Sequence, residues 1–262
     1  MKKYETAKII THIQASGICT MNIFAPEIAN MAKPGHFVMV YLDKGEHLLP
    51  RPISIYDADK IEGCITLVYA IVGAGTKIMS QWPPGHNLRV LGPLGNGFDM
   101  ETEIKQQNVS SINKKVALVG GGIGTAPLFF LAKELNEINV PMDIFLGFRQ
   151  STPRLSRSFE NLSDSLTIVT EEGGGKNIGY VTDFLPSAPD YFCIFSCGPT
   201  PMFKALAQYA KTHNIPCQIS VEERMACGLG ACKGCVVKTQ TGYQLCCESG
   251  PVFDSREVLF DA

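Results

Sequence analysis

The fold of the central part of this chain is decided by Lys115-Val-Ala-Leu-Val-Gly-Gly-Gly-Ile-Gly-Thr-Ala-Pro127. Residues 115–119 are mostly apolar, as in a buried strand, and the apolar run from Pro127 to Asn136 predicts a helix. Glycines between a strand and a helix let the backbone approach a diphosphate, which the N–H groups of the helix N-terminus attract. We therefore predict a dinucleotide site formed by Gly120, Gly121, Gly122, Gly124 and Thr125. A tight turn without a ligand, in a flavodoxin-like sheet, is the alternative.

The same pattern continues along the chain. Apolar runs predict further strands at 142–146, 166–170 and 191–195, and a helix is expected at 201–212. Strands that alternate with helices predict a parallel sheet covered on both faces. Cys197 and Gly198 follow the last of these strands, where open α/β sheets bind ligands, so they are candidates for the same nucleotide site.

The choice between NAD and NADP stays open at this stage. The strict G-x-G-x-x-G pattern is absent, and Arg149 follows the second strand where an acidic residue would hold a ribose 2′-hydroxyl. An arginine there could instead face a 2′-phosphate.

The first hundred residues follow a different pattern. Short apolar runs at 7–13, 36–42, 64–72 and 87–91 are separated by Pro and Gly turns, with one helix expected at 75–82. Closely spaced short strands predict an antiparallel barrel or sandwich. The polar stretch 101–113 is expected to be a connection.

Half of the ten cysteines lie in one glycine-rich stretch near the C-terminus. Cys227, Cys232 and Cys235 have the C-x4-C-x2-C spacing of plant-type [2Fe-2S] centres, and a further ligand follows at Cys246 or Cys247. Zinc is the alternative, although its structural sites usually pair C-x2-C knuckles or include His. Only short strands, at 219–221 and 236–239, are expected here, so a metal centre should organise this tail.

Composition removes several classes of function. The 262 residues carry a formal net charge of -2, which argues against nucleic-acid binding and against a polybasic membrane surface. No apolar run approaches the roughly 18–20 residues that cross a bilayer, and the N-terminal residues lack an export signal. Clustered thiols in such a chain indicate a reducing cytoplasm.

The order of these segments resembles the ferredoxin-reductase family of flavoproteins. Arg51-Pro52-Ile53-Ser54 is similar to that family's flavin motif, and Leu67 to Thr76 is similar to its second flavin-contacting strand and turn. The resemblance implies an all-β and α/β multidomain chain with an FAD-binding antiparallel barrel (1–100), a Rossmann-like NAD-binding domain (101–213) and a [2Fe-2S] domain (214–262). It implies FAD contacts from Arg51, Pro52, Ile53, Ser54, Val68, Tyr69, Ala70, Gly75 and Thr76.

The resemblance becomes more specific in the C-terminal segment. Glu223 to Cys235, followed by Cys247-Glu-Ser-Gly-Pro251, closely resembles the electron-transfer subunits of type B, NAD-linked dihydroorotate dehydrogenases, as do Gly92-Pro-Leu-Gly-Asn-Gly-Phe98 and Gly179 to Asp183. That family's pattern selects Cys247 as the fourth ligand, because two residues and Gly-Pro follow it. Ser249 and Ala70 depart from the pattern, and the latter removes one flavin phosphate contact.

This resemblance also implies a mechanism and a partner. A separate catalytic subunit would oxidise dihydroorotate on its FMN, and electrons would pass through [2Fe-2S] and FAD to NAD+, in pyrimidine biosynthesis. A heterotetramer of two copies of each subunit is implied, with Leu229, Ala231 and Lys233 near the partner. No acid–base side chain of this chain is required, so no catalytic residue is named.

Two other functions are open on the sequence. One is the reductase component of another FAD and [2Fe-2S] system, such as an oxygenase or ferredoxin reductase; in the small subunit of an NADH-dependent ferredoxin:NADP oxidoreductase, an Asp ligand would be expected where this chain has only Cys. The other is a zinc-binding interaction module, which would be colourless.

Overall fold

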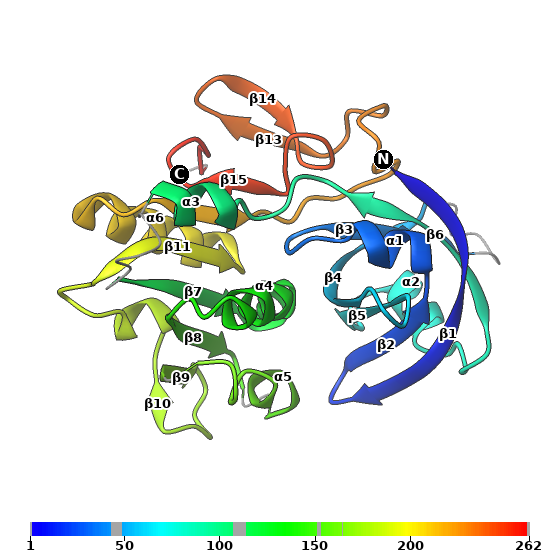
Figure 1. Ribbon diagram of the computed structural model, residues 1–262, viewed down its shortest axis with the longest axis horizontal. Coiled ribbons are helices and arrows are strands. Elements are labelled where there is room, and N and C mark those ends of the chain that lie inside the picture. The colour runs from blue at the N-terminus through cyan, green and yellow to red at the C-terminus, as the bar shows by residue number, and fades with distance from the viewer. Residues whose placement is uncertain (1, 43–48, 107–113, 151–152, 164, 261–262) are drawn as a thin grey trace. The chain divides into compact units, whose positions relative to one another are not determined.

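The computed structural model describes residues 2–42, 49–106, 114–150, 153–163 and 165–260. The chain forms two compact units (Figure 1). The first contains Met1–Gly97, Glu222–Val237 and Tyr243–Pro251, and the second contains Phe98–Val221, Lys238–Gly242 and Val252–Ala262. The residues of the predicted C-terminal domain, 214–262, are thus shared between the two units.

The first unit contains the antiparallel barrel that the N-terminal pattern predicted. Six strands close in the order β1-β2-β5-β4-β3-β6. Their bounds are β1 Lys3–Ala15, β2 Ile18–Phe24, β3 Phe37–Val40, β4 Arg51–Asp59, β5 Cys64–Ala70 and β6 Asn87–Leu94. Two short helices, α1 Pro26–Met31 and α2 Ala74–Met79, accompany them. Alternate strand residues such as Met21, Ile55 and Leu67 are fully buried, which stabilises the barrel by roughly 1.5–3 kcal/mol per large side chain.

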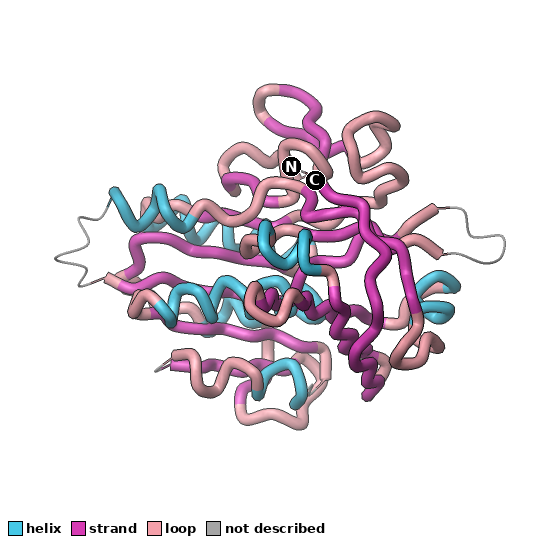
Figure 2. The backbone as a smooth tube through the Cα atoms, turned by 45° about the vertical axis from the view of Figure 1, so that its right-hand side comes forward, coloured by secondary structure: helices cyan, strands magenta, loops and turns pink. Residues whose placement is uncertain are grey.

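The second unit contains a seven-stranded sheet in the order β10-β9-β8-β7-β11-β12-β15, which confirms the predicted parallel α/β fold. The strands run β7 Lys115–Gly121, β8 Met142–Phe148, β9 Ser165–Thr170, β10 Asn177–Ile178, β11 Tyr191–Cys197, β12 Cys217–Ser220 and β15 Val252–Asp254. All neighbours pair in parallel except β12 with β15. Figure 2 shows these strands stacked as one layer with helices beside them.

The helices of this unit are α3 Met100–Gln106, α4 Ala126–Glu137, α5 Pro153–Arg157 and α6 Thr200–His213, with 3-10 turns at Gly122–Thr125 and Val181–Phe184. Pro127 lies in the first turn of α4, as expected. The long helices bury apolar stripes that include Leu128 and Leu131 of α4 and Phe203 of α6. A hairpin of β13 Val236–Thr239 and β14 Gly242–Leu245 follows the cysteine-rich loop.

Two predictions about local structure need correction. The stretch expected to be a connection at 101–113 begins with helix α3, because Asp99 accepts a hydrogen bond from the Thr102 N–H (3.0 Å) as an N-cap. Residues 107–113 of that stretch lie outside the described residues. The strand expected at 115–119 continues through Gly120 and Gly121, because both still pair with Leu146 and Gly147 of β8.

Candidate functional site

The glycine-rich turn lies in the second unit, where β7 ends and α4 begins. Gly122 has φ +57, a left-handed conformation that favours glycine. The hydroxyl of Thr125, fully buried, donates to the Gly122 carbonyl oxygen (3.0 Å) and closes the turn. The first turn of α4 therefore follows a compact loop of small residues, as binding of a diphosphate requires.

The structure brings this turn against the second predicted segment. β7 and β11 are neighbours, and Gly120 pairs with Cys197. A Cβ on Gly124 would lie 2.8 Å from the carbonyl carbon and oxygen of Cys197, so only glycine fits there. A Cβ on Gly198 would lie 3.0 Å from the Gly121 nitrogen. The two candidate nucleotide segments thus lie against each other at the carboxyl ends of adjacent parallel strands, where ligands of such sheets bind.

Arg149 is engaged with an acidic residue. It follows β8 and forms an ion pair with Glu172, whose carboxylate also accepts a hydrogen bond from Gln150 (2.9 Å). Hydrogen bonding to Glu172 raises the pKa of the already basic guanidinium, and hydrogen bonds from Gln150 and then Arg149 lower the pKa of Glu172.

The predicted flavin residues lie in the first unit, on β4, β5 and the start of α2. The Arg51 guanidinium rests directly on Gly75: a Cβ on Gly75 would lie 2.2 Å from Nε and 2.5 Å from Cζ. Arg51 Nη1 donates to the Leu49 carbonyl oxygen (2.6 Å), which holds the side chain across the turn. The Thr76 hydroxyl oxygen accepts hydrogen bonds from the N–H groups of Val72 (3.0 Å) and Gly73 (3.1 Å). A guanidinium fixed against the first turn of a helix is suited to a diphosphate.

Strand alternation divides the other flavin candidates between two faces. Ile53 and Tyr69 are buried, on the side of the strands that carries Ile55 and Leu67. The Tyr69 hydroxyl is hydrogen-bonded to His12 Nε2 (3.0 Å). Burial is the largest cause that raises the pKa of Tyr69, and the neighbouring Cys19 thiol raises it further. The pairing of Ile55 with Leu67 sets Ser54 beside Val68 on the opposite face, with Pro52 and Ala70 further along. On that face Val68 is buried as well, whereas the side chains of Pro52, Ser54 and Ala70 are half-buried.

The four predicted cluster ligands form two pairs in the first unit. The Cys232 N–H donates to the Cys227 Sγ (3.4 Å), and these two thiols are hydrogen-bonded to each other. The Cys247 N–H donates to the Cys235 Sγ (3.4 Å), and this second pair of thiols is also hydrogen-bonded. Two pairs suit two irons with two thiolates each. Among the described residues, no three His, Cys, Asp or Glu side chains gather as a single metal ion requires.

Backbone N–H groups point at these sulfurs. The Leu229 N–H donates to Cys227 Sγ (3.3 Å) and the Gly230 N–H donates to Cys247 Sγ (3.2 Å). Burial alone would raise the pKa of Cys227, but N–H groups, that of Leu229 foremost, outweigh it and lower the pKa to about 7. Donors aimed at sulfur stabilise a thiolate, the form that binds iron.

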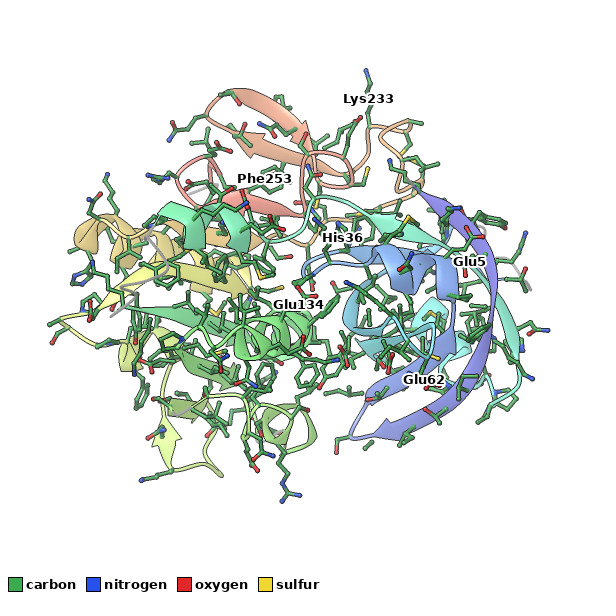
Figure 3. All side chains as sticks on the ribbon, viewed as in Figure 1. Glu5, His36, Glu62, Glu134, Lys233 and Phe253 are labelled. Carbon is green, nitrogen blue, oxygen red and sulfur yellow. The ribbon has the colours of Figure 1, made fainter. Side chains whose placement is uncertain are left out.

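The loop needs left-handed backbone, as its glycines predicted. Gly228, Gly230 and Lys233 have φ of +68, +81 and +53. Lys233 is exposed and points away from the ribbon (Figure 3). The fifth cysteine, Cys246, is completely buried, its N–H donates to the Cys235 carbonyl oxygen (2.8 Å), and burial raises its pKa. Cys247 is also buried, and what distinguishes it is the Gly230 N–H of the loop, which points at its Sγ.

Sequence reasoning missed the residues that attach this loop to the barrel. A Cβ on Gly228 would lie 2.6 Å from Cγ of Met39 on β3 and 3.1 Å from Cδ1 of Leu94 on β6. Asn96, which follows β6, donates hydrogen bonds to the segment after Cys247. Its motif, Gly-Asn-Gly, was visible in the sequence, but nothing local indicated its distant partner.

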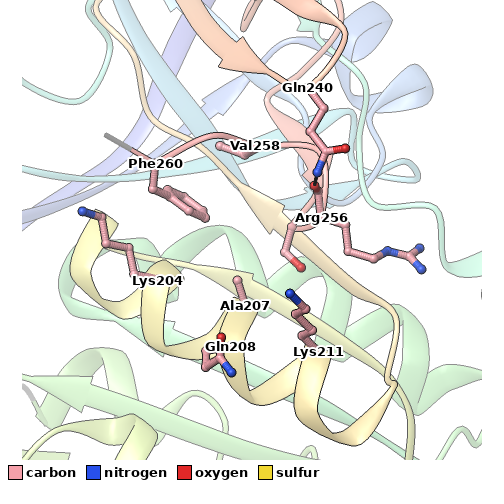
Figure 4. A pocket seen from close by; sticks show the side chains of 9 residues that line it. Lys204, Ala207, Gln208, Lys211, Gln240, Arg256, Val258 and Phe260 are labelled. Atoms are coloured by element: carbon pink, nitrogen blue, oxygen red, sulfur yellow. Dashed lines mark hydrogen bonds between the residues drawn. The ribbon is translucent and has the colours of Figure 1, made fainter. Parts of the chain in front are cut away.

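A separate hollow of about 560 Å³ lies in the second unit between α6 and the C-terminal segment (Figure 4). Its lining includes three cations, Lys204, Lys211 and Arg256, and Gln240 donates there to the Arg256 carbonyl oxygen (2.6 Å). None of the predicted nucleotide residues line it. In the part of the chain that the structure describes, no helix is long and apolar enough to span a membrane.

Comparisons of sequence and structure with known proteins find relatives that are electron-transfer proteins. Residues 222–259 match the family model of the iron-sulfur cluster binding domain of dihydroorotate dehydrogenase B. The electron transfer subunit of dihydroorotate dehydrogenase B (NAD(+)) from Clostridium acetobutylicum is 38% identical over 99% of both chains, and that of Desulforamulus reducens is 34% identical over 100% of both. A solved NADH-dependent reduced ferredoxin-NADP oxidoreductase is 26% identical with a TM-score of 0.82, covering 97% of this chain and 90% of the other.

Proposed function

Because this chain belongs to the family of electron transfer subunits of dihydroorotate dehydrogenase B, we propose that it carries electrons from the FMN of a dihydroorotate-oxidising subunit through [2Fe-2S] and FAD to NAD+. As a member of that family it is an oxidoreductase subunit, and its cofactors are an iron-sulfur cluster, FAD and NAD. A cluster passes single electrons, nicotinamide accepts a hydride, and flavin connects the two.

The observation that carries the proposal is the pairing of the four thiols. Cys227 with Cys232, and Cys235 with Cys247, would each hold one iron, and the N–H groups of Leu229 and Gly230 would stabilise the thiolates. A zinc module would need four ligands around one ion, which this pairing does not favour.

Residues of the barrel and of the α/β unit would bind the other two cofactors. Arg51 and the first turn of α2 would hold the FAD diphosphate, with Pro52, Ser54, Val68 and Ala70 on one face of the strands and the backbone of Ile53 and Tyr69 beside them. Gly120 to Thr125, with Cys197 and Gly198, would bind the diphosphate of NAD(H). The work of these groups is to bind and orient, since a hydride step needs no side-chain acid or base.

The surface of the cluster loop is our proposed docking site for the catalytic subunit. Leu229 is 44% exposed, and Ala231, Cys232 and Lys233 are also exposed, so a thiol of the cluster lies at the surface among apolar and cationic groups. Exposed apolar side chains at a functional edge are typical of an interface. We also propose two copies of each subunit per complex, and a cytoplasmic location, since thiolate ligands need a reducing compartment.

Substitution of one surface ligand tests the proposal. In the complex purified with its catalytic subunit, Cys232→Ser should abolish the reduction of NAD+ by dihydroorotate. It should leave partly intact the oxidation of NADH by an artificial acceptor that takes electrons from the flavin. Cys64→Ser, in the barrel and outside the loop, is the matched control and should change neither activity. Survival of both activities in Cys232→Ser would contradict the relay, as would a colourless, iron-free preparation of the unmodified protein.

A further inference from the structure

Asn96 holds the segment that follows Cys247 with three hydrogen bonds. Its Nδ2 donates to the carbonyl oxygens of Glu248 (3.1 Å) and Ser249 (3.0 Å). Its backbone N–H donates to the carbonyl oxygen of Gly250 (2.6 Å). A carboxamide nitrogen has two N–H donors, one for each of the two backbone carbonyl oxygens, so the arrangement uses the full donor capacity of the side chain.

The turn that carries Asn96 is fitted closely to its surroundings. Gly95 has φ +79, and a Cβ there would lie 2.4 Å from Cδ of Pro251. A Cβ on Gly97 would lie 2.2 Å from the Pro34 carbonyl oxygen. Asn96 itself pairs with Pro251 in an isolated parallel bridge. The close contacts of the glycines on both sides therefore fix the position of Asn96 directly after strand β6.

The held segment leads directly to a cluster ligand. Glu248 follows Cys247, and its carboxylate packs on Gly230, where a Cβ would lie 2.5 Å from Oε2. The Gly230 N–H donates to the Cys247 Sγ (3.2 Å), and the Cys247 N–H donates to the Cys235 Sγ (3.4 Å). A shift of the Glu248 backbone would therefore disturb one of the two thiol pairs.

We propose that Asn96 is a positioning residue for electron transfer, fixing the Cys247 side of the cluster loop to the barrel that carries the flavin residues. The inference rests on the proposed function, because it takes Cys247 as a ligand and the outer face of β4 and β5 as the flavin site. Electron transfer slows as the distance between donor and acceptor grows, so the position of the ligand loop relative to the flavin residues affects the rate. Asn96, the segment after Cys247, and strands β4 and β5 all lie within the first unit.

The test compares three variants of the full-length, cofactor-loaded protein. Asn96→Ala removes both side-chain hydrogen bonds, and Asn96→Asp keeps the volume but places a carboxylate against two carbonyl oxygens. Asn22→Ala is the control, because Asn22 also donates one side-chain hydrogen bond, to Thr66 on the barrel (3.1 Å). Asn96 is exposed, so the barrel core should tolerate its substitution.

Two readouts are needed, one of which does not depend on turnover. Hydrogen exchange of the backbone N–H groups of residues 246–250 should become at least about fivefold faster in both Asn96 variants, since two exposed hydrogen bonds contribute at least that factor to an opening equilibrium. In anaerobic stopped-flow with NADH, bleaching of the flavin should keep the rate of the unmodified protein, while appearance of the reduced cluster should slow. The control should match the unmodified protein in both.

The outcomes separate the inference from the proposed function. If NADH reduces no cluster even in the unmodified protein, the proposed function fails. If it does, and cluster reduction in Asn96→Ala and Asn96→Asp is equally fast, only the role of Asn96 is refuted. If Asn96→Ala slows cluster reduction and Asn96→Asp does not, the side chain at position 96 acts only by filling space, which would also refute the role of Asn96. Loss of the cluster with FAD retained supports the proposal, whereas loss of both cofactors assigns Asn96 to folding and overturns it.

Discussion

Gly75→Ala should weaken FAD binding without weakening the fold. An alanine Cβ at this position would lie 2.2 Å from Nε and 2.5 Å from both Cζ and Nη2 of Arg51, so the guanidinium must leave the first turn of α2. Gly75 lies inside that helix, where alanine is the better helix former by up to about 1 kcal/mol, so the free energy of unfolding should not fall. The substitution thus separates the position of Arg51 from the stability of the helix.

The expected loss follows from the interaction that Arg51 would make. A hydrogen bond from a charged group contributes about 1.5–3 kcal/mol, and each 1.4 kcal/mol is about tenfold in affinity, so the Kd for FAD should rise roughly 10- to 150-fold. Titration of the deflavinated protein with FAD, followed by flavin fluorescence, measures this change. Thermal unfolding of the same samples without FAD measures the stability.

Gly73→Ala is the matched control for this experiment. Gly73 precedes the same helix, its φ of -158 suits any residue, and a Cβ there would meet nothing within 4 Å. Its FAD affinity should therefore stay near that of the unmodified protein. Equal FAD affinity in Gly75→Ala and Gly73→Ala would refute the assignment of Arg51 to the flavin diphosphate.

Two further predictions concern the cysteine pair and pH. Cys247→Ser should lower the iron and sulfide content and the visible absorption of the cluster, whereas Cys246→Ser should keep both, because the Gly230 N–H of the loop points at the Cys247 thiol; the reverse result would exchange the two assignments. Burial, followed by Lys33, lowers the pKa of His36 from 6.5 to about 4, so the folded state resists protonation that the unfolded state accepts. Stability contributed by neutral His36 is complete above about pH 6.5 and is lost as pH falls towards 4, by about 3 kcal/mol at most, at 1.36 kcal/mol per unit of pKa. Chemical denaturation between pH 7 and pH 4 should show a shallower loss in His36→Gln, and an unchanged slope would contradict this cause.

Much of the architecture followed from local patterns. Apolar runs located the core of β7, β8 and β11, because a strand buried on both faces consists mostly of apolar residues. β9 was also located, although its first four residues are only half-buried. Helix α3 was not predicted, since a short polar helix has no apolar stripe and depends on its cap at Asp99. That Tyr69 faces the barrel interior could have been expected from its spacing with Ile65 and Leu67.

The cysteine spacing and the glycine-rich turn were determined by the sequence alone, because each is a local chemical requirement met within about ten residues: thiolates at ligand spacing, and glycine where backbone must approach a phosphate. Only the tertiary structure decided that Cys247 pairs with Cys235, that Arg51 lies on Gly75 and that Asn96 holds the chain after Cys247. The Asn96 contact joins residues 152 positions apart in the chain, and no local pattern can indicate such a pair. It forms because closing the barrel and winding the loop around its thiols bring both segments to the same place.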